Sequence, residues 1–373
     1  MDRFRYLNDW EEEILAFKRA TDGRCVSRRA FCAGLAALGL SPLVATMQPV
    51  DAKEPDIVLV NWGGDSVKAM DQAYVQPFLE ANPGEGIKID SSGATSGKIK
   101  AMVEAGRVVW DMCDRAFHAS LQLGREGLLE EIDYSVVDKS KVLPGFAGRW
   151  GVANYCFANV LTYDTRAFGG RKPESWADFW NIKDFPGRRT LRRHIDSTLE
   201  VALLADGVPI DKIYPIDVKR AFDKVKQIKD HVTFWSSHAD SYKLLRDGEV
   251  TMGCLAHTRS VTLRRDTNGA IDFTFNQGIF WVSGWIVPKG NPAGKRVWKM
   301  IASTQDPAGQ IELLKLMGNG PVNPAANALI TPDLAAINPS SPENLKRMVV
   351  ADMEWYAANS NTVLNQFIDN VLS

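Results

Sequence analysis

The sequence predicts an α/β protein with two lobes that the chain crosses twice. Short apolar runs alternate with amphipathic segments over residues 57–129, and a second set of this kind follows over 175–256. Such alternation is typical of a sheet with helices on both faces. Two long extended stretches, 151–163 and 280–288, join the sets. We therefore expect a ligand cleft between two lobes that hinge about these stretches.

The first set contains three short strands that alternate with three helices. In chain order these elements are expected at 57–61, 67–80, 87–91, 96–105, 108–112 and 121–129. In an open α/β sheet the ligand binds at the carboxyl ends of the strands. Those ends are the loops 62–66, 92–96 and 114–118, which are therefore the first candidates for a binding site.

The second set opens with a clear helix start, because Ser175 is followed three residues later by the acid Asp178, the pattern of a capping box. The strands and helices that follow are expected at 189–193, 195–205, 217–229, 242–247 and 250–256. After the second extended stretch the remaining segments have helical spacing. These helices are expected at 297–303, 309–317, 341–357 and 362–371.

The composition is that of a globular chain large enough for about two domains. Of 373 residues, 45% are apolar and 24% are charged, and 44 Lys and Arg against 45 Asp and Glu give a net charge of −1. A nucleic-acid partner is not expected, because proteins that bind nucleic acids usually carry more Lys and Arg than Asp and Glu. The sequence has no G-x-S-x-G or H-E-x-x-H motif and no cysteine pair with metal-ligand spacing. We therefore expect no enzyme, metal or cofactor, with a secreted hydrolase as the alternative.

Residues 1–52 are expected to be an export signal. Arg28 and Arg29 stand directly before an uncharged, mostly apolar run over 30–50. Twin arginines ahead of such a run are typical of the twin-arginine export route. Small residues near Ala52 predict cleavage after it, which would release the mature protein into the periplasm. The alternative is an uncleaved membrane anchor, because the run is long enough to span a bilayer.

Three cysteines, Cys113, Cys156 and Cys254, lie beyond this leader. An oxidising compartment would permit one disulfide and one free thiol. Because proteins exported by the twin-arginine route often fold before export, three reduced thiols are the alternative.

Seven segments stand out by their order and spacing: 61–65, 91–95, 110–111, 175–180, 244–250, 281–290 and 318–324. Together they resemble the extracellular solute-binding proteins of ABC importers, in particular the branch that binds spermidine and putrescine. The resemblance implies a two-lobed periplasmic-binding-protein fold of type II without catalysis. It also implies delivery of a small solute to an ABC permease in the inner membrane, and we expect a monomer. The expected first lobe is 53–155 with 283–325, and the second is 156–282 with 326–373.

The resemblance also implies a set of ligand-binding residues. Trp281 stands where a family Trp packs on the ligand, and Asp196 with Glu200 resembles the acidic pair at the start of a helix in the second lobe. In polyamine binders carboxylates hold the amines and aromatic faces hold the methylene chain. Trp62, at the end of the first strand, is expected to lie across the ligand from Trp281. Ser283 occupies a position where polyamine binders carry an Asp.

A second hypothesis is a binding protein for an anionic or zwitterionic solute. Arg259 and His257 lie near the expected cleft and suit an anionic group. Ser92 and Thr95 precede a helix, where hydroxyls and backbone N–H groups can bind an anion. Ser283 in place of an acid also favours this hypothesis.

Several candidates also have a purely structural interpretation. Asp65 and Thr95 are each placed to cap the helix that follows. Ser197 and Glu200 together have the spacing of a capping box. Asp114, in the third strand-end loop, is the remaining acid expected to face the cleft.

Overall fold

The protein is built around one mixed sheet. The computed structural model describes residues 56–373. Its strands are β1 (Ile57–Val60), β2 (Ile87–Asp90), β3 (Met112–Ala116), β4 (Val152–Asp164), β5 (Arg189–Arg192), β6 (Val232–Trp235), β7 (Met252–Ala256), β8 (Ile271–Ile286) and β9 (Val349–Val350). The strand order is β2-β1-β3-β8-β4-β7-β5-β6, and β9 pairs with β8.

Within the described residues, helices separate and follow these strands. They are α3 (Asp65–Met70), α4 (Gln76–Ala81), α5 (Ser96–Glu104), α6 (His118–Arg125), α7 (Trp176–Trp180), α8 (Thr198–Ala205), α9 (Val218–Lys226), α10 (His238–Arg246), α11 (His257–Asp266), α12 (Arg296–Ser303), α13 (Pro307–Met317), α14 (Pro332–Ile337), α15 (Pro342–Leu345) and α16 (Met353–Phe367). A π-helical turn, Asp71–Val75, joins α3 to α4. The predicted capping box of Ser175 and Asp178 is present at the start of α7.

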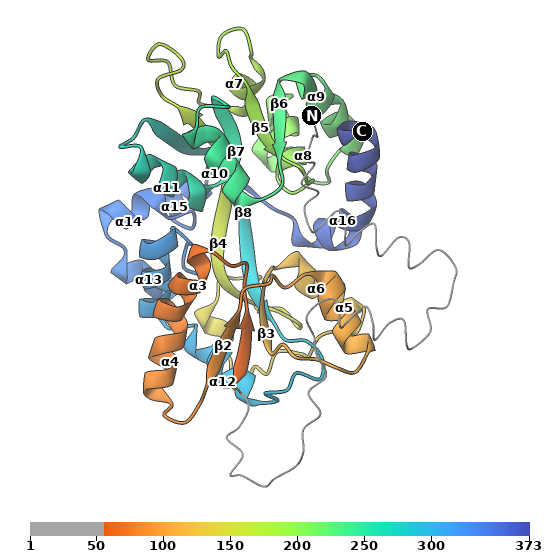
Figure 1. Ribbon diagram of the computed structural model, residues 1–373, viewed down its shortest axis with the longest axis vertical. Coiled ribbons are helices and arrows are strands. Elements are labelled where there is room, and N and C mark those ends of the chain that lie inside the picture. Colours follow the sequence, from red (N-terminus) through yellow and green to blue (C-terminus); the bar gives the residue numbers. More distant parts are fainter. Residues whose placement is uncertain (1–55) are drawn as a thin grey trace, which may run out of the picture. The chain divides into compact units, whose positions relative to one another are not determined.

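Two sets of parallel strands define two lobes. β1 pairs in parallel with β2 and β3, and with α3–α6 and α12 these strands form the first lobe. β5 pairs in parallel with β6 and β7, and with α7–α11 they form the second lobe. Figure 1 shows helices of each lobe beside its own strands. The α/β fold class predicted from the sequence is confirmed.

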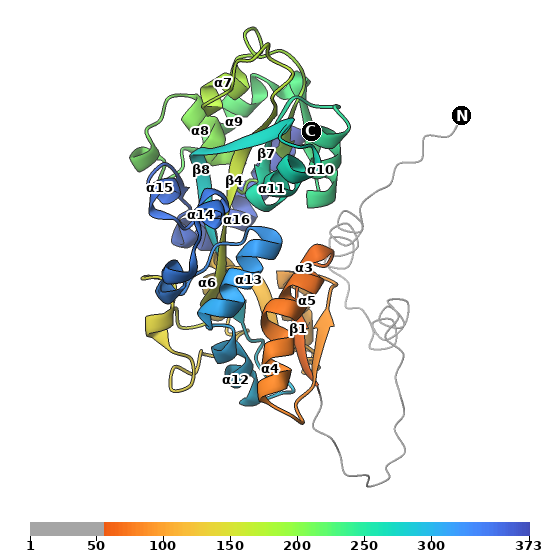
Figure 2. The same ribbon diagram turned by 90° about the vertical axis from the view of Figure 1, so that its left-hand side faces the viewer.

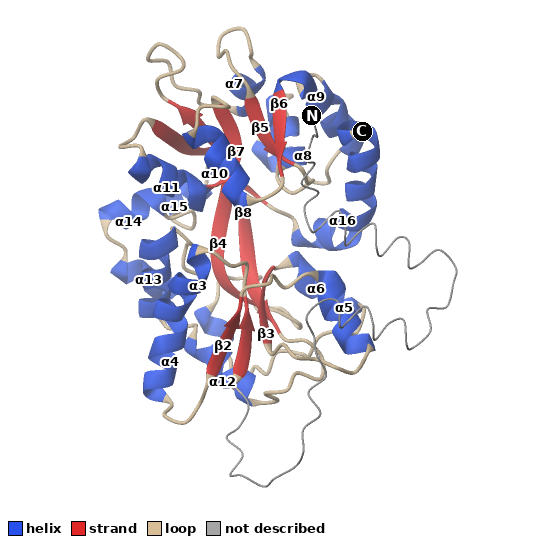
Figure 3. Ribbon diagram, viewed as in Figure 1, coloured by secondary structure: helices blue, strands red, loops and turns tan. Residues whose placement is uncertain are grey.

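The strands β4 and β8 connect the lobes, as Figure 3 shows in red. β8 pairs with β3 over 283–286, β4 pairs with β7 over 159–163, and β4 and β8 also pair with each other. The chain therefore crosses from the first lobe to the second in β4 and returns in β8. The β4–β8 ladder shifts register twice, between 153 and 155 and between 159 and 161. Such irregularities bend strands. The residue boundaries of the lobes stay a prediction.

The returning strand β8 is anchored in the core of the first lobe. Trp285 is fully buried, and its indole N–H donates to Thr304 Oγ1 (2.9 Å). Its ring meets that of Tyr74 edge-on, with ring centres 6.4 Å apart. Burial of an aromatic side chain contributes roughly 2–3 kcal/mol. This anchoring fixes the part of β8 that carries Trp281 and Ser283.

The third strand lies further along the chain than predicted. The sequence predicts 108–112, whereas β3 begins at Met112. The Asp111 side chain explains the difference, because its carboxylate accepts the backbone N–H groups of Val58 (2.7 Å) and Ala293 (2.7 Å). These side-chain bonds replace part of the strand ladder before Met112.

The segment 341–357, predicted as one helix, is divided into α15, β9 and the start of α16. Val349 and Val350 leave the helix and pair in parallel with β8. β-branched side chains fit a pleated strand better than a helix. The structure also contains β6, α11 and α14, which the sequence patterns did not predict. Figure 2 shows α14 beside α13, in the blue part of the chain.

The export signal expected over 1–52 lies outside the described residues, so Arg28, Arg29 and cleavage after Ala52 stay predictions. Across residues 56–373, none of the helices has the length and apolar character needed to cross a membrane.

The cysteines Cys113, Cys156 and Cys254 are buried and free of disulfides. Burial raises the pKa of all three thiols, that of Cys156 to about 12. The thiols are therefore protonated at neutral pH and behave as small apolar groups. Of the two alternatives, the structure agrees with three reduced thiols.

Candidate functional site

Side chains from both lobes gather where the strand-end loops of the two lobes meet. We call this set the junction site, and its members are Trp62, Arg115, His118, Arg192, His194, Asp196, Arg259, Trp281 and Tyr356. Asp196 of the second lobe acts electrostatically on Arg115 and His118 of the first lobe. The first lobe and the second thus face each other through charged groups at strand ends, where α/β sheets bind ligands.

Arg115, near the end of β3, is held on two sides. Its Nη2 donates to Ser96 Oγ (2.9 Å), and its guanidinium lies 5.5 Å from the ring centre of Trp62. Its buried Nε has no hydrogen-bond partner. Burial lowers the pKa of Arg115, but a guanidinium remains charged at neutral pH. Arg115 therefore offers a fixed cation with an open N–H, the partner that a carboxylate prefers.

Asp196 lies between β5 and α8 and is paired with two side chains. Arg192 Nη1 donates to its Oδ2 (3.0 Å), and His194 Nδ1 lies 3.1 Å from its Oδ1. The same Nδ1 lies 3.2 Å from the backbone nitrogen of Asp196, so it either accepts that N–H or, when protonated, donates to Oδ1. When Nδ1 accepts, Oδ1 has no hydrogen-bond partner. Burial alone would raise the pKa of Asp196, but His194 and Arg192 outweigh burial and hold this pKa well below its ordinary value. Asp196 is thus a carboxylate with one open oxygen.

His118 begins α6 and packs between two aromatic rings. Its ring centre lies 5.9 Å from that of Trp281 and 5.6 Å from that of Tyr356. Burial lowers the pKa of His118 to about 4, so the imidazole is neutral at neutral pH. Its Nδ1 has no partner.

Unpartnered polar atoms concentrate at this place. Among the described residues, six buried side-chain nitrogen or oxygen atoms lack a hydrogen-bond partner, and four of them belong to the junction site or adjoin it. These four are Arg115 Nε, His118 Nδ1, Asp196 Oδ1 and Glu200 Oε2. Buried polar groups normally have partners, and a cluster of exceptions calls for a specific reason. A polar solute that completes these bonds is such a reason.

Trp281 forms a wall of the junction site. It is 2% exposed, and the ring of Phe157 stacks on it with centres 6.4 Å apart. Its indole N–H donates to Ser197 Oγ (2.8 Å), which also accepts from Asn159 Nδ2 (2.7 Å). Phe157 is partly exposed, unlike Trp281. Phe157 is therefore the more accessible aromatic ring of this stack.

The capping box expected for Ser197 and Glu200 is wrong. Ser197 has a left-handed backbone conformation (φ 63°) and makes no side-chain cap. Its hydroxyl turns instead to Trp281, and the Glu200 carboxylate turns to two tyrosines. Tyr214 (2.6 Å) and Tyr356 (2.7 Å) both donate to Glu200 Oε1. Glu200 is fully buried, so its carboxylate is first of all a structural acceptor.

Asp114 and Ser283 bond to each other across β3 and β8. Asp114 accepts hydrogen bonds from Ser283 Oγ (2.6 Å), Asn154 Nδ2 (3.1 Å) and Tyr155 OH (2.8 Å). Burial raises the pKa of Asp114 despite these bonds. Three protein donors already bind this carboxylate, which pins three strands together and leaves neither Asp114 nor Ser283 as an open group.

His257, expected to face an anionic solute, is fully buried and engaged with backbone. Its Nδ1 accepts the N–H of Ala158 (3.0 Å), and its Nε2 lies 2.6 Å from the carbonyl oxygen of Gly318. With Nδ1 accepting, Nε2 carries the proton and donates. Burial lowers the pKa of His257 to about 4, so the ring stays neutral. The expectation for His257 is therefore corrected to a structural role, which ties α11 to β4 and to the end of α13.

The remaining candidates lie at helix starts. Thr95 caps α5, with Oγ1 accepting the N–H of Lys98 (3.3 Å). Ser92 is exposed in the loop before it. Asp65 does not cap α3, because Gly64 takes the N-cap position. Asp65 instead lies 3.6 Å from Arg259 Nη1 on α11, and this ion pair joins the first lobe to the second.

Five residues of the junction site were not singled out from the sequence: Arg115, His118, Arg192, His194 and Tyr356. Arg115 and His118 lie in the loop 114–118, which the strand-end rule did indicate. Arg192 and His194 lie on either side of the end of the predicted strand 189–193, where the same rule applies. Tyr356 had no local signal, because it reaches the site only through the packing of α16.

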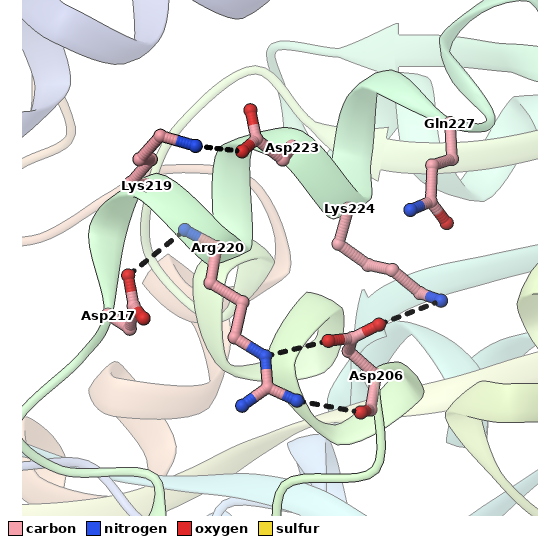
Figure 4. Close-up of a pocket in the computed structure, with 7 residues that line it drawn as sticks. All are labelled: Asp206, Asp217, Lys219, Arg220, Asp223, Lys224 and Gln227. Carbon is pink, nitrogen blue, oxygen red and sulfur yellow. Dashed lines mark hydrogen bonds and ion pairs between the residues drawn. The ribbon is translucent and has the colours of Figure 1, made fainter.

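Two hollows on the surface lie away from the junction site. The first, about 320 Å³ in volume, is lined by charged side chains on and near α9 (Figure 4). There Asp206 pairs with Arg220 (2.7 Å) and Lys224 (3.3 Å), so the charges satisfy each other. The second, about 650 Å³, lies over α13 and α14. Within 56–373, no cluster of three His, Cys, Asp or Glu residues could hold a metal ion.

The geometry can be compared with known proteins. The family described as bacterial extracellular solute-binding protein matches residues 73–339. This chain belongs to that family. It is the solute-binding component of an ABC importer, which binds a small solute and delivers it to a membrane permease. Members of this family are binding proteins and not enzymes.

Two curated relatives differ clearly in similarity. The γ-aminobutyric acid-binding protein of Pseudomonas aeruginosa is 31% identical over 322 residues, 85% of this chain and 91% of the relative. The spermidine/putrescine-binding periplasmic protein of Escherichia coli is 21% identical over 326 residues, 83% of this chain and 88% of the relative. The family resemblance noted in the sequence is confirmed, while its polyamine branch has only this more distant support.

Solved structures agree with the fold. An ABC transporter substrate-binding protein from Bradyrhizobium japonicum has 34% identity and a TM-score of 0.81, covering 85% of this chain and 99% of that one. The Atu4243 GABA receptor has 32% identity and a TM-score of 0.78, covering 84% of this chain and 96% of that one.

Proposed function

We propose that this solute-binding protein captures a small zwitterion with a carboxylate at one end and an ammonium at the other, such as γ-aminobutyric acid. The observation that carries the proposal is the open donor Arg115 Nε and the open acceptor Asp196 Oδ1 in one buried cluster. A guanidinium suits a carboxylate, and a desolvated ammonium needs an anionic partner. The two relatives named for γ-aminobutyric acid, 31% and 32% identical, support the same solute class.

The charges at the junction site disfavour the polyamine alternative. Arg115, Arg192 and Arg259 bring three guanidiniums to this site, and Arg192 and Arg259 each have a nearby acid. A solute with two or more ammonium groups would be repelled by these cations. A zwitterion balances its own charge and meets one partner of each sign.

The acids that a diamine would need are already engaged. Asp114 accepts three protein hydrogen bonds, and Glu200 is fully buried behind Tyr356 and accepts two. Ser283 replaces the acid that polyamine binders carry. Asp196 therefore remains as one carboxylate for one ammonium group, which fits a zwitterion and leaves the second amine of putrescine without an acceptor.

Trp62 offers an apolar surface for the chain between the two charged ends. It is 47% exposed and lies beside Arg115. Each buried methylene contributes about 0.8 kcal/mol, so three methylenes contribute about 2 kcal/mol. The rest of the binding free energy would come from the two charged ends. A solute that contacts both lobes shifts the equilibrium toward their closed arrangement.

Isothermal titration calorimetry with four matched solutes tests this proposal. γ-Aminobutyrate, butyrate, butylamine and putrescine share a four-carbon chain and differ only in their terminal charges. We expect binding of γ-aminobutyrate and at least about a hundredfold weaker binding of the other three. Butyrate lacks the ammonium group, butylamine lacks the carboxylate, and putrescine carries a second ammonium group in place of the carboxylate. Binding of putrescine without binding of γ-aminobutyrate would reject the zwitterion in favour of the polyamine class.

A further inference from the structure

The C-terminal helix α16 connects the two lobes at the solute site. Tyr356 lies in its first turns, and its hydroxyl donates to Glu200 Oε1 on α8 of the second lobe (2.7 Å). The same ring lies 4.7 Å from that of Trp281 and 5.6 Å from that of His118, which begins α6 of the first lobe. Glu354 of α16 also pairs with Arg125 of α6 (2.5 Å). One helix thus contacts a buried acid in one lobe and a site residue in the other.

Glu200 is the acceptor on which this arrangement depends. Its Oε1 takes hydrogen bonds from both Tyr214 and Tyr356, and its Oε2 has no partner. The other titratable groups that face this network are Asp196 on the preceding loop, Cys254 on β7 and Asp352 beside Tyr214. These groups are acidic or neutral, so the Tyr356 bond is one of two side-chain hydrogen bonds that stabilise the Glu200 charge, beside a backbone hydrogen bond.

We propose that Glu200 is a positioning residue for the solute site, which acts through Tyr356 to hold His118 and Trp281 in place. The inference rests on the proposed function, because it concerns the same site. Tyr356 is fully buried and reaches both rings, so a shift of its ring moves the wall against which His118 packs. His118 Nδ1 is one of the open polar atoms that a solute would complete.

The proposal has a consequence near neutral pH. Burial raises the pKa of Glu200 to about 7. Above this pH the carboxylate is charged, and charge-assisted hydrogen bonds are shorter and stronger than neutral ones. Tyr356 is then held more firmly, and solute affinity should rise between pH 6 and pH 8. His118, with a pKa of about 4, does not titrate in this range.

Two tyrosine variants separate positioning from simple stability. Tyr356→Phe and Tyr214→Phe each remove one hydroxyl from the same Glu200 oxygen, but the contacts of the Tyr214 ring are with Trp355 and not with His118 or Trp281. The first readout is the NMR signal of the His118 ring proton in the protein without solute. We expect Tyr356→Phe to shift this signal and to weaken γ-aminobutyrate binding about tenfold. Tyr214→Phe should shift the signal much less and weaken binding less than twofold.

A charge variant supplies the second readout. Glu200→Gln keeps an oxygen that accepts both hydroxyls but cannot ionise. We expect wild-type affinity to rise about fivefold from pH 6 to pH 8 and the rise to be absent in Glu200→Gln. Since His194 also lies at the site, the difference between the two proteins is the measured quantity.

Equal effects of the two tyrosine variants on His118, or the wild-type pH profile in Glu200→Gln, would overturn the positioning role. The His118 signal needs no solute. A shift in Tyr356→Phe without any γ-aminobutyrate binding by the wild type would therefore reject the proposed solute while supporting the role of Glu200.

Discussion

Two acids near the junction of the lobes, the buried Asp114 and the partly buried Asp196, have opposite surroundings. Asp114 on β3 accepts three hydrogen bonds from neutral donors on β4 and β8. Asp196, after β5, is paired with Arg192 and lies beside His194, yet its Oδ1 has no donor. At Asp114 the effect of burial outweighs the hydrogen bonds and raises the pKa. At Asp196 the nearby His194 and Arg192 outweigh burial and lower the pKa.

The difference separates a structural acid from a binding acid. A buried carboxylate that is satisfied by neutral donors fixes the strands around it, and nothing remains for a solute. A carboxylate that is kept ionised and partly unsatisfied is suited to accept a cationic group from outside. Sequence position alone does not distinguish the two, because both residues follow or end a predicted strand.

The strongest test of this contrast is Asp196→Asn. The variant removes the charge that would pair with the solute ammonium, and loss of one partner from a buried charge pair costs roughly 2–5 kcal/mol. We therefore expect γ-aminobutyrate affinity to fall about a thousandfold by calorimetry, with the unliganded protein still folded by circular dichroism. Asp114→Asn serves as the matched control. An equal loss of affinity in the control would remove the distinction between the two acids.

A third acid, Glu200, is buried without a cationic partner, and its titration should make the free energy of unfolding depend on pH. Its pKa rises from 4.5 to about 7 in the folded protein, so the folded state binds the proton more tightly than the unfolded chain does. This proton stabilises the fold below pH 4.5, and the stabilisation is lost as pH rises through 7. The loss is roughly 3 kcal/mol for a shift of this size. Urea unfolding between pH 5 and pH 8 should show a steeper decline in the wild type than in Glu200→Gln, and parallel curves would contradict it.

The fold could be predicted because its signals are local. Alternation of apolar runs and amphipathic segments predicted the α/β class, and the extended stretches predicted β4 and β8 as the crossing strands. The misses arose where tertiary contacts override local pattern. Asp111 ties its segment to β1 by side-chain bonds, and β9 leaves a helical pattern in order to pair with β8.

The candidate site could be predicted only in part. Trp62 and Asp196 lie in loops after strands, Arg259 lies in the first turn of the helix after β7, and the strand-end rule places such residues near a ligand. Tyr356 lies 156 positions from its partner Glu200 in the sequence, and no local pattern connects them. His257 has the residue type of an anion-binding group, but its bonds to two backbone groups depend on how α11 packs.

The variant Asp114→Ala tests whether Asp114 stabilises the fold and does not bind the solute. This change leaves the donors Asn154, Tyr155 and Ser283 without their acceptor in a buried place, and an unsatisfied buried group costs roughly 1–3 kcal/mol. Some donors can rotate to new partners, so we expect a loss of about 2 kcal/mol in the free energy of unfolding, measured by urea denaturation. Solute affinity should change less than threefold. A stable variant with abolished binding would assign Asp114 to the solute instead.

The smallest expected effect concerns the ion pair between the lobes. Arg259 and Asp65 are 3.6 Å apart, and Asp65 is 79% exposed, so solvent and salt screen their attraction. Exposed ion pairs contribute about 0.2–1 kcal/mol. Asp65→Asn should therefore weaken γ-aminobutyrate binding no more than about threefold, and the difference from wild type should vanish in 1 M salt, because salt at that concentration screens the attraction between exposed charges. A loss that persists at high salt would mean that Asp65 touches the solute directly and would move the boundary of the binding site to the start of α3.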